Sequence, residues 1–181
     1  MFAEFIIIVQ ALFFFLPAYA ANMAPVIFSK VKILQPLKIP INTKLFGAHK
    51  TYYGFCVGIG LAVFVGLLEA LYGKYFSVLS DHDSFGAKWW IYLCFLMGFG
   101  ALFGDLIKSF FKRRLGIASG APFVPFDQID FIFGTLFVLY FFGIFSEISQ
   151  QFVLPFIFFS PFLQVISNLI AYKLGLKKVW W

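Results

Sequence analysis

The chain has 181 residues, of which 62% are hydrophobic and only 12% charged, and its mean hydropathy is +0.93. Soluble domains are about 45–50% apolar, so this composition excludes a water-soluble globule. The net charge of +6 indicates basic loops that face anionic lipid and the cytoplasm rather than a nucleic-acid partner. We therefore predict an all-α integral membrane protein with a single polytopic domain over residues 1–181.

Five apolar segments are candidates for membrane-spanning helices, each of which needs roughly 20 residues. The first resembles a signal peptide, but no Lys or Arg precedes its apolar core, so we expect it to be retained as a helix. The third spans only if its last turns include charged residues. We place the five segments at Glu4–Asn22, Tyr52–Tyr72, Trp89–Phe111, Phe131–Ile148 and Phe152–Tyr172.

The basic residues predict the orientation of the bundle. Twelve of the 14 Lys and Arg residues fall in the loop after segment one, around the loop after segment three, or in the C-terminal tail. Only Lys74 and Lys88 fall on the opposite side. The positive-inside rule then places the N-terminus outside and the C-terminus in the cytoplasm. The cytoplasmic loops 24–51 and 112–130 are expected to form the polar site.

Charged residues gather at the cytoplasmic end of the third segment. Asp105, Lys108, Ser109 and Lys112 follow one another at helical spacing and therefore share one face of a helix. A carboxylate inside a membrane span is costly and typically functional, so we predict a functional role for Asp105. The basic run Lys112–Arg114 has a second interpretation, an ordinary basic cluster that snorkels to the cytoplasmic edge.

Two further acids, Asp127 and Asp130, stand three residues apart just after Pro125. An acid near a helix N-terminus can simply cap that helix, which accounts for one of them. The second lies one turn further into an apolar segment. Together with Asp105 they would place three carboxylates from two adjacent helices at one membrane depth. This arrangement suits Mg²⁺ that is shared with substrate phosphates.

The segment Gly47-Ala48-His49-Lys50-Thr51 precedes the second span and resembles part of a Walker phosphate loop. It lacks the glycine before the lysine, and no strand is predicted before it, so the loop itself is excluded. Two interpretations stay open. Lys50 and Thr51 either contact phosphate at a helix N-terminus or act as an interfacial lysine and a helix cap.

The central motif, Gly104-Asp105-x-x-Lys108-Ser109-Phe110-x-Lys112-Arg113-Arg114, together with Asp127-Gln128-x-Asp130 and Gly134, resembles the signature of the CDP-archaeol synthase family. That family is an archaeal relative of the CDP-diacylglycerol synthases. Weaker matches are Gly47-x-x-Lys50-Thr51-x-x-Gly54, Ala21-Asn22-x-x-Pro25 and Asn168-x-x-Ala171-Tyr172-x-x-Gly175-x-Lys177. The chain has Gln164 where the family is expected to carry a His.

The resemblance implies a Mg²⁺-dependent cytidylyltransferase that uses CTP and 2,3-bis-O-geranylgeranylglyceryl phosphate and forms CDP-archaeol and pyrophosphate. We predict Asp105, Asp127 and Asp130 as catalytic metal ligands and Lys108 as the catalytic cation. The predicted partners are CTP, the isoprenoid lipid phosphate and the bilayer, and the active site faces the cytoplasm. The predicted nucleotide and phosphate contacts are Lys50, Thr51, Lys108, Ser109, Lys112, Arg113, Arg114, Gln128 and Asn168.

Three other classes of protein would each require particular residues or binding properties. An anion transporter or channel needs polar residues on the outer half of the bundle, where we find only Glu69. A structural subunit would use the same charges only as ion pairs and would not bind CTP. A CDP-alcohol phosphotransferase needs an Asp-Gly step among spaced aspartates, and the chain has no Asp-Gly dipeptide.

Overall fold

The computed structural model describes residues 2–31, 36, 38–72, 86–148, 150–177 and 179. Within these residues every regular element is a helix, and strand pairing is limited to one isolated bridge between Pro40 and Thr51. The predicted all-α class is therefore confirmed. The α-helices are α1 (Phe2–Phe14), α2 (Leu16–Ile27), α3 (Thr43–Phe46), α4 (Tyr52–Tyr72), α5 (Gly86–Arg114), α6 (Phe126–Phe141) and α7 (Gln150–Lys173), and the 3₁₀ turns are η1 (Phe28–Lys30) and η5 (Phe145–Glu147).

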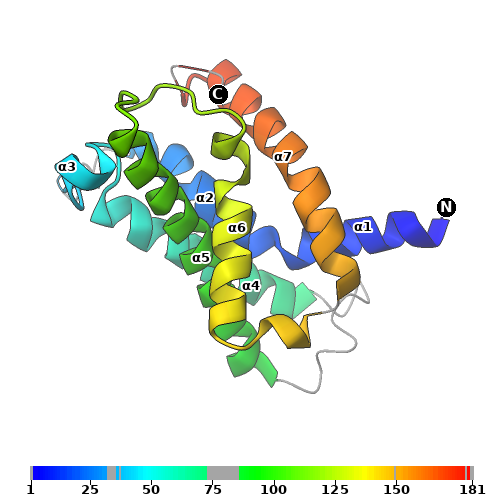
Figure 1. Ribbon diagram of the computed structural model, residues 1–181. Helices are drawn as coiled ribbons and strands as arrows, with labels where there is room; N and C mark the ends of the chain where they lie inside the picture. The colour runs from blue at the N-terminus through cyan, green and yellow to red at the C-terminus, as the bar shows by residue number, and fades with distance from the viewer. Residues whose placement is uncertain are drawn as a thin grey trace.

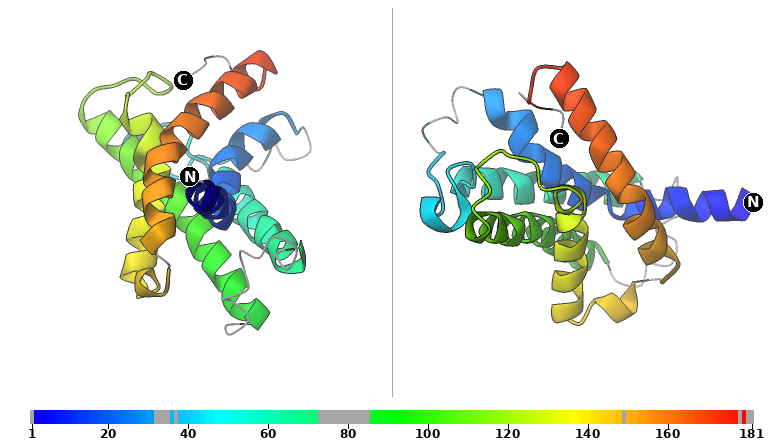
Figure 2. Two further views of the ribbon diagram at one scale, coloured as in Figure 1. Left: turned by 90° about the vertical axis from the view of Figure 1, so that its right-hand side faces the viewer. Right: turned by 45° about the horizontal axis from the view of Figure 1, so that its top comes forward.

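The long helix α5 is the centre of the bundle and packs against α2, α4 and α6 (Figure 1). The first helix, α1, projects away from this group and packs mainly on α7, which crosses it (Figure 2). The short helix α3 lies against α5, and α7 lies against α6. The cytoplasmic end predicted for α5 is thus flanked by α3 on one side and by α6 and α7 on the other.

Among the described residues, three helices are long and apolar enough to cross a membrane, namely α4, α5 and α7. The pair α1–α2 qualifies as a fourth if the two helices, which meet at a bend of 50°, form one broken span. Helix α6 has 16 residues, fewer than the roughly 20 needed for a full crossing. The membrane character is borne out, whereas five spans and the orientation of the termini stay predictions.

The first predicted span is wrong in one respect, because it is not a continuous helix. The break lies at Phe15, and Pro17 stands in the first turn of α2. A proline there lacks an N–H and cannot continue the preceding helix. Beyond the break, Ala18, Ala21 and Ala24 are fully buried, which lets α2 approach its neighbours closely.

The predicted fourth span, 131–148, also needs correction, because α6 begins at Phe126 and ends at Phe141. The chain turns at Gly143, which has a φ of +75°. Helix α5 runs on to Arg114, so the predicted polar loop 112–130 is irregular only between the two helices, over 115–125. Residues 24–27 of the other predicted loop still belong to α2. A prediction from apolar segments alone leaves out the charged turns of α5 and α6, which are stabilised by ion pairs.

Helices α5 and α6 cross in backbone contact at glycines. A Cβ atom on Gly104 would lie 2.1 Å from the carbonyl oxygen of Asp130, and one on Gly134 would lie 2.2 Å from the carbonyl oxygen of Gly100. Neither distance is possible for a real side chain. Small residues spaced by four, as at Gly100 and Gly104, allow such close approach between membrane helices.

A methyl group at this crossing is expected to destabilise the protein. Gly104→Ala forces α5 and α6 apart, because the nearest atoms belong to backbone and cannot rotate away. We expect a loss of about 1–3 kcal/mol, measured by thermal unfolding in detergent. Gly60→Ala is the matched control, since a Cβ there meets nothing within 4 Å. Equal melting temperatures for the two variants would contradict the proposed crossing.

Candidate active site

Three carboxylates converge on the ammonium group of Lys108. Its Nζ lies 3.0 Å from Asp105 Oδ1, 3.0 Å from Asp127 Oδ1 and 2.6 Å from Asp130 Oδ2. Asp105 and Lys108 come from the last turns of α5, and the other two acids come from the first turns of α6. The structure thus brings these four side chains together from two adjacent helices.

Two more lysines flank this centre. Lys50, which follows α3, pairs with Asp105 Oδ2. Lys112 pairs with a different acid, since its Nζ lies 3.5 Å from Asp127 Oδ1. The same Nζ also donates to the carbonyl oxygen of Ala121 in the loop after α5. Three ammonium groups thus face three carboxylates. We call this set the ionic cluster; its members are Lys50, Asp105, Lys108, Lys112, Asp127 and Asp130.

The ionic cluster is buried unevenly. The side chain of Asp130 is 5% exposed and that of Lys112 is 8% exposed, whereas Lys50 and Asp105 reach 25% and 21%. Buried charges are tolerated only when they are paired, and the equal numbers of acids and bases satisfy this requirement. The cluster is therefore balanced in charge, and its most exposed edge is the one formed by Lys50 and Asp105.

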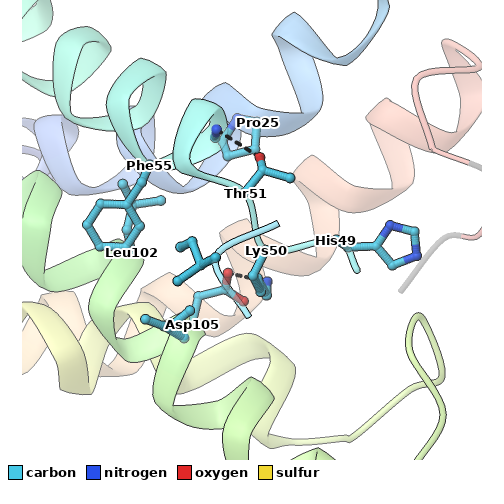
Figure 3. A pocket seen from close by; sticks show the side chains of 10 residues that line it. Pro25, His49, Lys50, Thr51, Phe55, Leu102 and Asp105 are labelled. Atoms are coloured by element: carbon cyan, nitrogen blue, oxygen red, sulfur yellow. Dashed lines mark hydrogen bonds and ion pairs between the residues drawn. The ribbon is translucent and has the colours of Figure 1, made fainter. Parts of the chain in front are cut away.

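A small pocket of about 50 Å³ opens at this edge, between α2, α4 and α5. Figure 3 shows Lys50 and Asp105 pointing toward one another on its polar side, while Phe55 and Leu102 form an apolar side. The pocket thus places an ion pair directly beside apolar surface. Its full lining is Pro25, Ile41, His49, Lys50, Thr51, Gly54, Phe55, Leu102, Asp105 and Leu106.

The hydroxyl groups of Thr51 and Ser109, both predicted to contact phosphate, form hydrogen bonds with backbone atoms. Thr51 Oγ1 accepts a hydrogen bond of 3.0 Å from the N–H of Gly54, which is the helix cap that the alternative interpretation predicts. Ser109 Oγ donates to the carbonyl oxygen of Asp105 at 2.8 Å, and Ser109 is only 5% exposed. Thr51 lines the pocket beside Lys50, whereas Ser109 is turned back onto its own helix.

The remaining predicted contacts of α5 and α6 differ in their surroundings. Arg113 is half-buried, and its Nε has no hydrogen-bond partner within the described residues. The exposed Arg114 lies over the ring of Phe110, 4.9 Å from the ring centroid. Gln128 is 7% exposed, and the described part of the chain offers no hydrogen-bond partner to its Oε1. Arg113 and Gln128 therefore keep hydrogen-bonding capacity next to the cluster.

Lys177 approaches the site from the C-terminal tail, which sequence reasoning did not anticipate. Its Nζ donates to Asn168 Oδ1 at 3.0 Å. Burial lowers the pKa of Lys177 from its ordinary value, while the nearby carboxylate of Asp127 acts in the opposite direction. The only signal in the sequence was the match at Gly175-x-Lys177, because residues so distant along the chain reveal no contact by spacing.

The donor chemistry of the three acids fits Mg²⁺, which prefers carboxylate oxygens. Within the described residues, however, no group of three His, Cys, Asp or Glu side chains is already arranged around a metal position. The position among the three carboxylates is taken by the ammonium group of Lys108.

Removal of the central cation is expected to destabilise the cluster. Lys108→Met leaves three carboxylates close together and should cost up to about 3–5 kcal/mol. Adding Asp130→Asn removes one of the repelling charges, so the double variant should be more stable than Lys108→Met alone. Thermal unfolding of the wild type, both single variants and the double variant measures this coupling. Additive effects would contradict a shared electrostatic centre.

The sequence of this chain matches one protein family over almost its whole length. The family model described as CarS-like, CDP-archaeol synthase, matches residues 4–181. The chain is 34% identical over 177 residues to the CDP-archaeol synthase of Pyrobaculum islandicum, covering 94% of this chain and 98% of the relative. It is 35% identical over 173 residues to that of Methanocaldococcus jannaschii, covering 94% and 96%.

The fold is also similar to a solved structure, which is described as an intramembrane enzyme for archaeal membrane lipid biosynthesis. The TM-score is 0.65 and the sequence identity is 25%. The similarity covers 92% of this chain and 94% of that one. Sequence and structure comparisons therefore agree over the same length of chain.

Proposed function

The chain belongs to the CDP-archaeol synthase family, and we propose that the ionic cluster is the site at which it carries out the family's reaction. The enzyme transfers the cytidylyl group of CTP to an archaeal lipid phosphate and forms CDP-archaeol for membrane lipid biosynthesis. We propose 2,3-bis-O-geranylgeranylglyceryl phosphate as the acceptor. Pyrophosphate is the second product.

The convergence of three carboxylates and three ammonium groups at the ends of two membrane helices supports this proposal. Both substrates carry phosphate groups, and one of them also carries hydrocarbon chains. Ammonium groups bind phosphate directly, and carboxylates bind phosphate through a divalent metal. A site at the end of membrane helices can meet a soluble nucleotide and a membrane lipid at the same place.

In the proposed mechanism an oxygen of the lipid phosphate attacks the α-phosphorus of CTP. A new P–O bond forms, the bond between the α-phosphorus and the bridging oxygen breaks, and pyrophosphate leaves. The attacking phosphate is already an anion, so the site needs no strong general base. Catalysis then consists of positioning the two substrates and stabilising the charge of the leaving group.

The lysines are proposed to change partners when substrate binds. Lys50, Lys108 and Lys112 each contact a carboxylate in the structure. The phosphates of CTP compete with the carboxylates for these ammonium groups. Because the ammonium groups are already inside the site, binding does not require them to be desolvated anew. Because the side chains are held in place beforehand, less conformational entropy is lost on binding. Arg113 and Gln128, which keep hydrogen-bonding capacity nearby, are proposed to complete the nucleotide contacts.

We propose Asp105, Asp127 and Asp130 as the ligands of Mg²⁺. When bound, the metal would neutralise phosphate charge and orient the reacting groups. The acids come from two different helices, so their relative positions depend on the crossing of α5 and α6. The carboxylates of Asp105 and Asp127 are also more exposed than that of Asp130 and are the more accessible to an incoming metal–nucleotide complex.

We propose that the site faces the cytoplasm of the cell membrane, where CTP is made. The positive-inside rule supports this orientation, because the ionic cluster lies at the end of α5 that carries the basic run Lys112–Arg114. In this topology α1–α2 is one broken span and α6 is a short one. The N-terminus is then outside and the C-terminus is in the cytoplasm.

The alternative of an anion transporter is less well supported. Glu69 is the one acid of the outer half of α4, and its side chain is buried at 3% exposure. Neither of its carboxylate oxygens has a hydrogen-bond partner within the described residues. A single buried acid does not make a polar path across the membrane.

Substitution of one proposed metal ligand is expected to abolish turnover while the fold persists. Asp127→Asn should lower the rate by at least about 100-fold, because loss of a carboxylate weakens electrostatic stabilisation of the transition state. The measurement is conversion of radiolabelled CTP to CDP-lipid by the purified protein. Glu69→Gln, a matched change of a buried acid outside the cluster, should keep near-normal activity. Near-normal activity of Asp127→Asn would contradict the assignment.

Removal of divalent metal tests the proposed cofactor separately. Chelation of the purified enzyme should abolish formation of labelled CDP-lipid, and added Mg²⁺ should restore it, because carboxylates bind the triphosphate only through a cation. The protein should remain folded after chelation, since Lys50, Lys108 and Lys112 already neutralise the three acids. Turnover that persists in excess chelator would exclude the Mg²⁺ assignment.

A further inference from the structure

The C-terminal tail turns back onto α7 in a defined way. Gly175 has a φ of +65°, a conformation in which a side chain is strained. The N–H of Leu176 donates to the carbonyl oxygen of Ala171 at 2.8 Å, and the N–H of Gly175 donates to that of Tyr172 at 2.9 Å. These bonds end α7 in the manner of a Schellman cap. The chain after Gly175 is therefore directed back along the helix rather than away from it.

This reversal brings the ammonium group of Lys177 to the inner face of α7. Its Nζ donates to Asn168 Oδ1 at 3.0 Å, more than two helical turns before it in sequence. One turn further along the same face, Gln164 Oε1 accepts a hydrogen bond of 3.0 Å from Asn22 Nδ2 of α2. The bond from Asn22 holds this face of α7 toward α2, and the bond from Lys177 orients the side chain of Asn168. Lys177 is thus held in place by a cap and by a partner on a fixed helix.

Lys177 stands near the ionic cluster. The charges of Asp127, Lys108, Asp105 and Lys50 all act on its ammonium group. Lys50 follows α3, which lies against α5, whereas Lys177 is carried by the tail of α7, which lies against α6 (Figures 1 and 2). The two lysines are therefore carried by different elements of the fold.

The surfaces next to these two lysines differ. Near Lys50 the chain exposes polar side chains of the loop and of α3, including Asn42, Thr43 and Lys44. Near Lys177 the last turns of α7 expose large apolar side chains, at Leu169, Ile170, Tyr172 and Leu174. A phosphate that carries hydrocarbon chains can keep those chains on this apolar surface of α7 while its charged group reaches Lys177. The nucleotide triphosphate, which has no such chains, suits the polar side.

We propose that Lys177, held by Asn168, binds the phosphate group of the lipid substrate. The inference rests on the proposed function and adds to it a division of labour between cations. Lys50 and Lys112 serve the triphosphate, and Lys177 serves the acceptor. In an in-line displacement the attacking and leaving oxygens stand on opposite sides of the phosphorus, so the acceptor needs a cation of its own, apart from those that hold the triphosphate. Lys177 thereby orients the nucleophile.

The test separates the two substrates kinetically. Lys177→Gln should raise the KM for the lipid phosphate by about tenfold or more, because a charge-assisted contact is lost, and should leave the KM for CTP unchanged. Lys177→Arg should restore most of the affinity. Lys173→Gln, which removes an exposed lysine from the last turn of the same helix, is the matched control and should leave both values unchanged.

A second variant and a second readout keep the test independent of catalysis. Gly175→Ala strains the cap and displaces Lys177 without removing its charge, so it should raise the same KM. Lipid phosphate alone, without CTP, should raise the thermal unfolding midpoint of the wild type more than that of Lys177→Gln.

Two outcomes would overturn the proposal: a change in the KM for CTP alone, or unchanged values of both KM and of the lipid-induced stabilisation. The second outcome would leave Lys177 as a helix-capping cation only. Absence of CDP-lipid formation by the wild type would instead contradict the proposed function. The lipid-induced shift of the unfolding midpoint would still decide the role of Lys177.

Discussion

Backbone contact between α5 and α6 positions five of the six charged groups of the ionic cluster, all except Lys50. Gly104 meets the carbonyl oxygen of Asp130, and the next residues on α5 include Asp105 and Lys108. On α6, Gly134 lies one turn after Asp130 and packs against the backbone of Gly100 and Gly104. A larger residue at the crossing would move two of the acids away from the lysine. The short distances from Lys108 to three carboxylates are therefore a consequence of glycine packing as well as of charge.

The ionic cluster illustrates how a membrane enzyme can keep reactive charges without substrate. Each acid is buried to a degree that would be unfavourable alone, and Lys108 compensates for all three. In the proposed mechanism, substrate phosphates replace carboxylates as partners of the ammonium groups, whose charges are already balanced before substrate binds. Stability and function thus draw on the same side chains. Removal of one of them is expected to affect both, which is why kinetic and unfolding measurements are needed together.

The sequence predicted the central charged residues of this site, but it did not predict the ends of the surrounding helices or the approach of Lys177. Helical spacing and the cost of charge in a membrane were sufficient to group Asp105 and Lys108 with the acids of α6. The break at Phe15 was missed because an averaged apolarity does not register a proline in the first turn of α2. The start of α6 was missed because ion pairs with a distant segment permit charged helical turns. Lys177 was missed because its position depends on a reversal at Gly175 that no local pattern links to Asp127.

The most direct test of the central claim, that the ionic cluster is the catalytic site, is a structure of the enzyme with CTP and Mg²⁺. The account predicts the triphosphate at the edge formed by Lys50 and Asp105, with at least one ammonium group of the cluster moved from a carboxylate to a phosphate oxygen. Asp105, Asp127 or Asp130 should then coordinate the metal. A nucleotide bound elsewhere, with all ion pairs of Lys108 unchanged, would contradict it.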